Sequence, residues 1–301
     1  MMINYELYKV FYQVAVNASF SLAAKKLYIS QSAVSQNIKK LEKELQTKLF
    51  NRQAKQIKLT ETGQILFDHI EPAFNLIENG EKGIQAIQAL SKGEIHLGVN
   101  DTIAKDFLLP YLNQFHRLYP EIQIQITNRT SSTCSKLLKQ HKVDLIISNL
   151  PNQSLTNQLE VNIISQFNDI FIANQNFSKL KHKIIELNEL PNYPLLLLEK
   201  KTTTRKFLDE FFRIKDVEIE AKIELGSVDL LIEMAKIGLG IAFVPEYAFN
   251  SYLSRINNAN EKLFKLHLKN KLPARKLAVV KNKDVPVSNA VNAFLKLLLS
   301  G

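Results

Sequence analysis

The sequence predicts an α/β protein with a winged, mostly helical N-terminal unit, a long connecting helix and a two-lobed C-terminal unit. Three patterns predict this order. They are a helix-turn-helix pattern over residues 19–45, a heptad repeat of apolar residues over 61–92, and short apolar strands alternating with helices from Gly93 onward. A chain of 301 residues exceeds one average domain, and its hydrophobic fraction of 46% is ample for several cores.

The first elements are a leading helix and a helical hairpin. The leading helix is predicted by apolar residues at helical spacing: Ile3, Leu7, Val10, Phe11 and Val14. In the hairpin, SFSLAAKKLYISQSAVSQNIKKLEKEL, the small Ala23 and Ala24 allow another helix to approach closely, and Ser30 is the expected N-cap of the second helix. One face of that second helix is apolar, with Val34, Ile38, Leu41 and Leu45.

The opposite face of the second helix is polar and fits a DNA groove. Gln and Ser near a helix N-terminus can hydrogen-bond to base edges, and Lys one or two turns later can reach phosphates. The candidates for base contacts are Gln31, Ser32, Ser35 and Gln36. The candidates for phosphate contacts are Lys39, Lys40 and Lys43. On this stretch alone, an ordinary solvated amphipathic helix is the alternative.

A short two-stranded wing is predicted up to Thr60, because Ile57 and Leu59 alternate with a lysine. Its Arg52, Lys55 and Lys58 are placed to touch phosphates or an adjoining minor groove. Residues 1–60 hold ten basic side chains against three acidic ones, within a chain of net charge +10. This concentration of positive charge favours a polyanionic partner for the N-terminal unit.

A long helix is expected after Thr60, the predicted N-cap, with Glu61 in its first turn. Its heptad seam consists of Leu66, Ile70, Ala73, Ile77, Ile84 and Ile87, with Gly80 between them. Such a seam indicates pairing of two helices, most simply from two copies of the chain, and packing against the chain's own body is the alternative. Gly80 weakens the seam, and Pro72 is expected to bend the helix.

From Gly93 the pattern is that of α/β layers around a mainly parallel sheet. The expected strands are 94–99, 122–127, 143–148, 169–173, 194–199, 218–224, 241–244, 263–268 and 277–280. The expected helices lie around 107–118, 135–141, 205–212, 227–237 and 288–299. Nine strands over this length suit two lobes better than one sheet.

Several classes of function find no support in the residues. The six histidines lack metal-ligand spacing, and no nucleophile elbow or phosphate-binding loop is present, so neither an enzyme nor a cofactor is predicted. Cys134, the only cysteine, excludes an intrachain disulfide; it is expected to be a small, partly buried side chain, with a redox sensor as the alternative. Without a signal-peptide pattern or a membrane-length apolar run, a cytoplasmic protein with no membrane partner is expected.

The hairpin and wing resemble the DNA-binding module of LysR-type transcriptional regulators. The resemblance rests on Ser-Phe then Ala-Ala, Ser-Gln then Ala-Val-Ser, Leu-Glu, Leu-Phe then Arg, and Leu-Thr then Gly, within residues 19–63. Downstream, residues 93–98 and LGSVDLLIEMAKIGLGIAFVPEY (225–247) are similar to parts of the family's effector domain. One departure is Ser32, where the family usually has proline; serine loses some pre-organisation of φ but adds a hydroxyl that could contact DNA.

The resemblance implies a winged helix-turn-helix domain (1–60), a dimerising linker helix (61–92) and an effector-binding domain (93–301) of the two-lobed, periplasmic-binding-protein-like type 2. Lobe one would comprise about 93–164 and 267–301, and lobe two about 165–266, joined by two crossover strands. The implied partners are double-stranded DNA carrying a promoter inverted repeat, a small-molecule effector, and further copies of the chain in a homodimer or homotetramer. RNA polymerase is a further candidate partner.

In such a module a ligand lies between the lobes, where strands end and helix N-termini offer N–H donors. Short polar residues and one arginine follow the expected strands there: Asn100, Thr102, Thr130, Ser131, Asn149, Thr202, Thr203, Thr204, Arg205 and Ser227. Hydroxyls beside an arginine suit a carboxylate, sulfate or phosphate, and helix capping is the alternative for each residue. Asp101 would repel an anion and is expected to cap the following helix.

The expected function is sequence-specific DNA binding and transcriptional regulation in response to a small anionic metabolite. Two alternatives stay open. A ligand-independent DNA-binding protein would leave the cleft-bearing unit without a role. A transport-type solute-binding protein would have no use for the basic winged unit and should carry an export signal.

Overall fold

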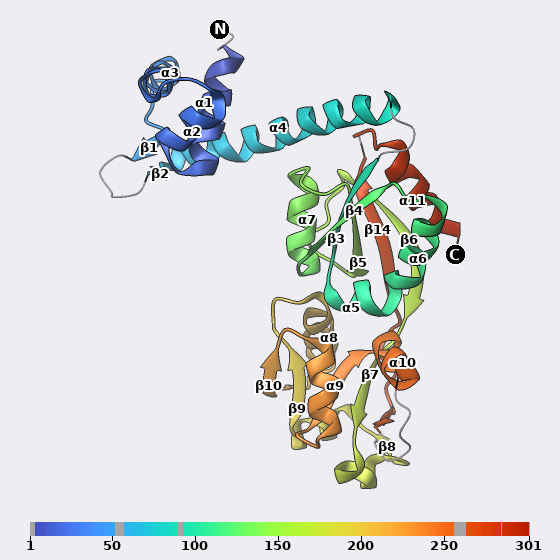
Figure 1. The fold of residues 1–301 in the computed structure, drawn as a ribbon. Helices are drawn as coiled ribbons and strands as arrows, with labels where there is room; N and C mark the ends of the chain where they lie inside the picture. Colours follow the sequence, from blue (N-terminus) through green and yellow to red (C-terminus); the bar gives the residue numbers. More distant parts are fainter. Residues whose placement is uncertain (1–3, 52–56, 89–92, 256–262, 284, 301) are drawn as a thin grey trace. The chain divides into compact units, whose positions relative to one another are not determined.

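The computed structural model describes residues 4–51, 57–88, 93–255, 263–283 and 285–300, without the side chains of residues 79 and 82–88. The chain forms two compact units, Met1–Lys82 and Gly83–Gly301, and each is described by itself (Figure 1). None of the helices within the described ranges is long and apolar enough to cross a membrane.

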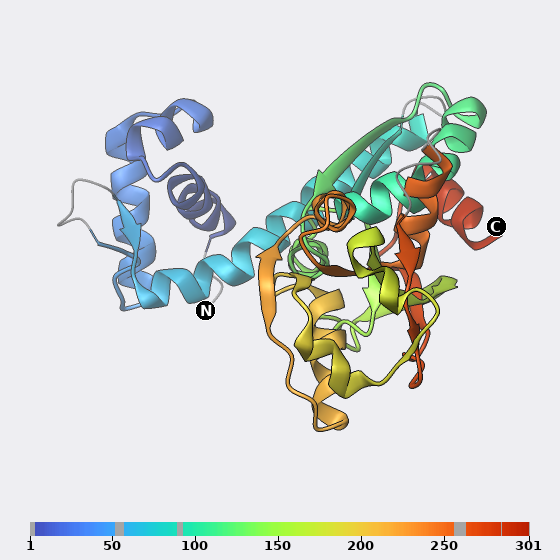
Figure 2. The same ribbon diagram turned by 90° about the horizontal axis from the view of Figure 1, so that it is seen from below.

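The N-terminal unit is a winged helical domain (Figures 1 and 2). Its elements are α1 (Tyr5–Asn17), α2 (Phe20–Leu27), α3 (Gln31–Glu44), β1 (Phe50–Asn51), β2 (Lys58–Leu59) and α4 (Glu61–Gln88). Each of the first three helices begins at a residue whose side chain accepts a backbone N–H bond, namely Asn4, Ser19 and Ser30. Ser30 is therefore the N-cap that the sequence predicted.

One core joins the three helices to the wing. Leu7, Val10, Phe11 and Val14 of α1 are buried in it, as the helical spacing predicted, whereas Ile3 lies outside the described residues. The apolar stripe of α3 enters the same core, although Leu45 is only half-buried. The two short strands pair antiparallel, with Phe50 opposite Leu59.

The start of α4 is fixed by a cap and by a glycine. The Thr60 hydroxyl accepts a bond from the Gly63 N–H at 3.0 Å, so Thr60 caps the helix as predicted. A Cβ atom at Gly63 would lie 2.1 Å from the Leu49 carbonyl oxygen. Only glycine permits this approach, which explains why the Leu-Thr pattern is followed by one. The helix runs through Pro72 without ending.

Lobe one of the C-terminal unit is a five-stranded sheet of order β4-β3-β5-β14-β6. Its strands are β3 (Glu94–Val99), β4 (Gln123–Asn128), β5 (Leu145–Leu150), β6 (Leu159–Phe167) and β14 (Arg275–Asn282). Helices α6 (Leu109–Leu118) and α11 (Asn289–Ser300) cover one face, and α7 (Ser131–Lys139) covers the other (Figure 1). A short α5 (Asp101–Ile103) and a π-helical turn (Ala104–Leu108) precede α6.

Lobe two repeats this plan with the order β10-β9-β11-β7-β12. The strands are β7 (Asp169–Ala173), β9 (Leu195–Leu198), β10 (Ala221–Leu225), β11 (Ile241–Pro245) and β12 (Phe264–Lys265). Helix α8 (Thr203–Ile214) packs on one face, and α9 (Val228–Lys236) and α10 (Glu246–Arg255) pack on the other. A separate strand pair, β8 (Ile184–Ile185) with β13 (His267–Leu268), lies beyond the sheet.

The structure corrects three expectations. Both sheets are mixed rather than mainly parallel, because β14 in lobe one and β7 in lobe two are antiparallel to their neighbours. Strand β6 and helix α10 were not predicted, although the alternation of polar and apolar residues in β6 is typical of a strand that is exposed on one face. Helix α7 begins at Ser131, four residues earlier than expected, with Thr130 as its cap.

Burial makes Cys134 unreactive in the native protein. Its side chain is enclosed in lobe one, and burial raises the pKa of its thiol to about 11. Because the thiolate is the reactive species, we expect Ellman's reagent to modify native Cys134 about a hundredfold more slowly than the denatured chain at neutral pH. Equal rates of modification in buffer and in guanidinium would show that the Cys134 thiol is accessible. That result would favour the redox-sensor alternative.

Candidate DNA-binding and effector-binding sites

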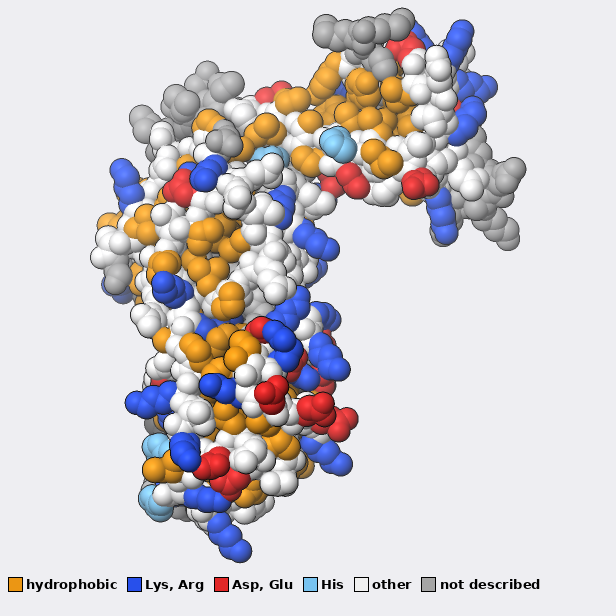
Figure 3. Space-filling model, turned by 180° about the vertical axis from the view of Figure 1, so that it is seen from behind, with side chains coloured by type: hydrophobic (Ala, Val, Ile, Leu, Met, Phe, Trp, Pro, Cys, Tyr) orange, Lys and Arg blue, Asp and Glu red, His pale blue; other side chains and the backbone are white. Residues whose placement is uncertain are grey.

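The exposed face of α3 carries the residues predicted to meet DNA. Gln31, Ser32, Gln36, Lys39, Lys40 and Lys43 are exposed, and Ser35 is half-buried at the edge of this face. The Ser21 hydroxyl of α2 donates to Gln31 Oε1 at 3.1 Å, and the Ser30 and Ser32 hydroxyls lie 2.8 Å apart. Ser21, which the sequence analysis did not single out, therefore orients Gln31. Figure 3 shows lysine and arginine side chains along an edge of the N-terminal unit.

Tyr28, between α2 and α3, is a second residue that no sequence motif marked as a DNA contact. It caps α2 in the left-handed conformation, with φ 56°, and its side chain is 94% exposed. A bulky residue in this conformation is strained. Because the aromatic ring is exposed, it adds no hydrophobic stabilisation to the fold. Both features are typical of a contact residue rather than a structural one.

The wing is tied to α3 by a buried carboxylate. Glu42 is 4% exposed, and its two oxygens accept bonds from the Leu49 N–H at 2.9 Å and from Lys48 Nζ at 3.1 Å. This contact is the physical reason for the Leu-Glu pair in the sequence pattern. Lys58 is exposed on β2, whereas Arg52 and Lys55 lie outside the described residues.

Helix α4 presents two faces within the N-terminal unit. Phe67 and Phe74 stack on Tyr12 of α1, with ring centroids 6.2 and 4.9 Å apart. Of the predicted seam, Leu66 and Ile70 are half-buried, whereas Ala73 and Ile77 are exposed. The side chains of Ile84 and Ile87 lie outside the described residues. Ala73 and Ile77 are thus exposed within the N-terminal unit, and pairing between chains stays a prediction of the heptad seam.

Several residues predicted to contact an effector are helix N-caps. Asn100, Thr130, Thr202 and Ser227 accept backbone N–H bonds at the starts of α5, α7, α8 and α9. Asp101, expected to cap α5, instead bonds to the side chain of Asn128, because Asn100 already provides the cap. Thr102 is half-buried in α5, and Thr203 is 8% exposed at the start of α8.

The arginine predicted to meet an anion is engaged inside lobe two. Arg205 is 4% exposed and donates to Asp209 at 2.7 Å, to Glu224 at 2.8 Å and to the Leu198 carbonyl at 3.0 Å. Two carboxylates thus compensate its charge. Arg205 therefore anchors α8 to the rest of lobe two. Its position at a helix start does not predict this role.

A different arginine joins the lobes. Arg275, at the start of β14 in lobe one, is 2% exposed, and its Nη1 donates to Asp169 Oδ2 at 2.9 Å and to the Thr204 hydroxyl at 3.0 Å, both in lobe two. Its Nε donates to the Leu150 carbonyl at 3.2 Å, and its guanidinium lies 4.9 Å from the Phe207 ring centroid. In the sequence Arg275 stands two residues before the expected strand 277–280, and this position alone did not mark it as a contact between the lobes.

Buried polar atoms without partners gather where β5, β14 and the starts of α7 and α8 meet. Within the described part of the chain, Arg275 Nη2, Ser131 Oγ and Asn149 Oδ1 are buried and have no hydrogen-bond partner. Leaving such groups unsatisfied costs about 1–3 kcal/mol each, so they are the atoms that a bound ligand would satisfy. Of the predicted set, Thr204 of lobe two bonds to Arg275 of lobe one. Ser131 and Asn149 each have a buried side-chain oxygen without a hydrogen-bond partner in the described part of the chain.

Two further ion pairs cross the interface. Lys105 Nζ lies 2.5 Å from Asp229 of α9, and Arg255 of α10 lies 2.9 Å from Asp106. Together with Arg275 and Asp169 they hold the lobes at three points. No group of three or more His, Cys, Asp and Glu residues among the described positions is placed to bind a metal ion.

Comparison with known proteins matches both units. Residues 5–64 match the family described as bacterial regulatory helix-turn-helix protein, lysR family, and residues 88–301 match the LysR substrate binding domain. The transcriptional regulator CysL of Bacillus subtilis is 28% identical over 298 residues, which cover 98% of this chain and 97% of CysL.

Solved structures share the fold. Full-length CbnR in complex with its target DNA has a TM-score of 0.66 and 16% identity, covering 98% of this chain and 99% of that one. The regulatory domain of CcmR from Synechocystis PCC6803 in complex with 2-PG has a TM-score of 0.62 and 20% identity, covering 69% of this chain and 97% of that one. The predicted fold class is confirmed.

Proposed function

The chain belongs to the LysR family of DNA-binding transcriptional regulators with a small-molecule-binding domain, and we propose that its effector is a small anion bound between the lobes at Arg275. One observation carries the proposal. Arg275 Nη2 is a buried, charged donor with no hydrogen-bond partner among the described residues, and it lies at the interface of the two lobes. Charge-assisted bonds from such a donor favour a carboxylate, sulfate or phosphate group.

The remaining effector contacts follow from the same interface. The unpartnered Ser131 and Asn149 of lobe one and the hydroxyl of Thr204 of lobe two would complete the site. Among the other predicted residues, the helix caps Asn100, Thr130, Thr202 and Ser227 would act through backbone N–H groups at the starts of those helices. Because the groups come from both lobes, binding would change how tightly the lobes are held together.

For the DNA-binding unit we propose that two copies of the chain pair through the exposed part of the α4 seam and present two α3 helices to an inverted repeat. Gln31, Ser32, Ser35 and Gln36 would meet bases, and the lysines of α3 with the basic wing would meet phosphates. Pairs of dimers would give a tetramer. The proposed domains are residues 1–60, 61–92 and 93–301, acting in the cytoplasm, without enzymatic activity.

A screen of small anions tests the effector proposal. Thermal unfolding of the full chain with sulfate, phosphate and a panel of organic acids should reveal an anion that raises the melting temperature, and DNase footprints with and without it should differ. Calorimetry in which only neutral compounds bind would reject an anionic effector. A bound anion that leaves every footprint unchanged would favour the ligand-independent DNA-binding alternative.

Two serines of α7 supply matched variants. Ser131→Ala removes a buried hydroxyl without a partner inside the described chain, so it should weaken effector binding about fivefold or more and should not lower the stability of the free protein. The Ser135 hydroxyl donates to the Ser131 carbonyl at 2.9 Å, so Ser135→Ala should lower stability instead. If both variants bind the effector like the wild type, Ser131 is not in the site.

Tyr28 gives a prediction in which stability and DNA affinity change in opposite directions. Tyr28→Gly relieves the strain of φ 56° and should raise the free energy of unfolding by about 0.5–1 kcal/mol. The same change removes the exposed ring and should weaken DNA binding. Tyr28→Phe keeps the ring and serves as the control. Thermal unfolding and fluorescence anisotropy measure the two effects, and unchanged affinity in Tyr28→Gly would remove Tyr28 from the interface.

A further inference from the structure

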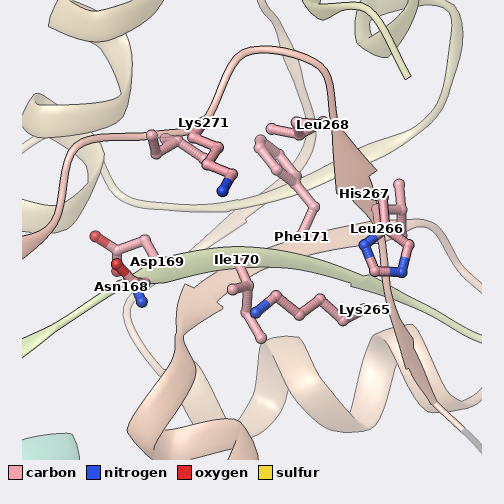
Figure 4. Close-up of a pocket in the computed structure, with 10 residues that line it drawn as sticks. Asn168, Asp169, Ile170, Phe171, Lys265, Leu266, His267, Leu268 and Lys271 are labelled. Carbon is pink, nitrogen blue, oxygen red and sulfur yellow. The ribbon is translucent and has the colours of Figure 1, made fainter. Parts of the chain in front are cut away.

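A pocket of about 320 Å³ opens on lobe two (Figure 4). One wall is the start of β7, and the other is the chain segment 265–272, which returns from lobe two toward β14 of lobe one. The pocket therefore lies beside both chain crossings between the lobes. Its volume is at the lower end of the range for small-molecule sites.

The floor of the pocket is apolar. Phe171 and Leu266 are buried in the lobe-two core, and Leu268 and Leu272 pack partly buried against the same core. The pocket is thus an opening onto the α8 side of the lobe-two core. An aliphatic or aromatic group bound there would bury an apolar surface about as large as that of one side chain.

A buried carboxylate forms one polar end. Asp169 lies on the same face of β7 as Phe171, because alternate residues of a strand share a face. The residue is 3% exposed, and Arg275 occupies its Oδ2. Its Oδ1 is buried without a hydrogen-bond partner among the described residues. A ligand that donates a hydrogen bond, and best one with positive charge, would satisfy this oxygen.

Basic side chains form the other polar end. Lys271 and His267 are exposed at the rim, and neither makes an ion pair with another described residue. Lys265, in contrast, is held by Glu246 at 2.5 Å. Figure 4 shows the ammonium end of Lys271 extending over β7 on the side where Asp169 and Phe171 are labelled. A carboxylate is the group that such a lysine would bind.

We propose that this pocket is a second ligand site, for an apolar amino acid. The ammonium group would bond to Asp169 Oδ1, the carboxylate would pair with Lys271, and the side chain would cover Phe171. Three kinds of group lie along the pocket: one carboxylate oxygen and one ammonium group without partners among the described residues, and an apolar floor. They match the three parts of such a molecule. Because Asp169 also holds Arg275 of lobe one, occupancy would act on the contact between the lobes.

Calorimetry of the full chain tests the ligand class directly. L-leucine and L-phenylalanine are expected to bind. Their analogues without the ammonium group, 4-methylpentanoate and 3-phenylpropanoate, should bind about tenfold more weakly or worse, because Asp169 Oδ1 would stay unsatisfied. Equal binding of an acid and its amino acid would overturn the role of Asp169. Absence of binding by both amino acids would overturn the pocket as their site.

Two lysines separate the pocket from general surface charge. Lys271→Met should weaken amino-acid binding about tenfold, whereas Lys269→Met, two residues away and paired with Glu186 outside the pocket, should not. Leu272→Trp should fill the pocket and abolish binding. Circular dichroism checks that each variant is folded. Wild-type affinity in Lys271→Met or Leu272→Trp would place the amino acid elsewhere. Lys271 and Leu272 lie outside the proposed effector site, so loss of binding in these two variants separates the pocket from a carboxylate bound at Arg275.

Discussion

Replacing Arg275 with methionine is expected to lower the free energy of unfolding by about 3–5 kcal/mol. The change leaves the buried carboxylate of Asp169 without its cation and removes the bonds that join β14 to Thr204 and to the Leu150 carbonyl. Methionine fills a similar volume, so little of the loss comes from a cavity. Urea unfolding followed by circular dichroism measures the effect.

The free energy of unfolding that Arg275→Met loses should depend on pH. Burial raises the pKa of Asp169, and the Arg275 guanidinium offsets part of that rise. Without Arg275 the pKa rises further above its value in the unfolded chain. An acid whose pKa is raised on folding favours the folded state at low pH, and this contribution disappears as pH rises through the folded pKa. The difference between variant and wild type should therefore shrink as pH is lowered from about 8 to 5.

A double variant separates charge from packing. Arg275→Met with Asp169→Asn removes both charges, so it should recover much of the lost stability and its pH dependence. A single variant as stable as the wild type would mean that Arg275 is not the principal tie between the lobes. A double variant no better than the single one would assign the loss to the bonds with Thr204 and Leu150 rather than to the ion pair.

The second large effect is expected in the sequence specificity of DNA binding. Gln36→Ala should reduce discrimination between the cognate repeat and a sequence changed at one position by about 1–3 kcal/mol, because an amide side chain can bond two groups of one base edge. The exposed position of Gln36, one turn into α3, fits this role. Anisotropy titrations on a set of single-base variants of the operator measure the loss.

Lys43→Ala is the matched control on the same helix. Lys43 is exposed in the last turn of α3. Loss of a phosphate contact there should weaken the binding of all DNA sequences alike, and the slope of log affinity against log salt should fall by about one released ion. If Gln36→Ala weakened cognate and random DNA equally, Gln36 would be a backbone contact. If Lys43→Ala changed the sequence preference, Lys43 would be a base contact rather than a phosphate contact.

The helical hairpin shows what local pattern can predict. The stripe of Val34, Ile38 and Leu41 becomes the buried face of α3, and Ser30 becomes its cap, because helix periodicity and capping depend on residues a few positions apart. The bounds of β3 and β7 also agree with the predicted strands. Strand β6 at the edge of its sheet was not predicted, although polar and apolar residues alternate in it as they do in β3.

The effector site shows where local pattern fails. The pattern after the strands predicts Arg205 as an anion ligand, whereas in the structure Asp209 and Glu224 already compensate its charge. Glu224 is nineteen positions from Arg205, and no local pattern signals the pairing. Asp169 and Arg275 are separated by 106 positions, and their pairing depends on how the two chain crossings meet.

The sequence by itself thus determined the winged helix-turn-helix, the heptad helix and the two-lobed α/β class, because these depend on periodicity, caps and short motifs. Only the tertiary structure decided which charged groups are free to act. The free energy of a buried charge depends on its partners and its distance from water, and both are set by strands and helices that are far apart in the chain. For this reason Arg205 became an anchor and Arg275 the proposed effector contact.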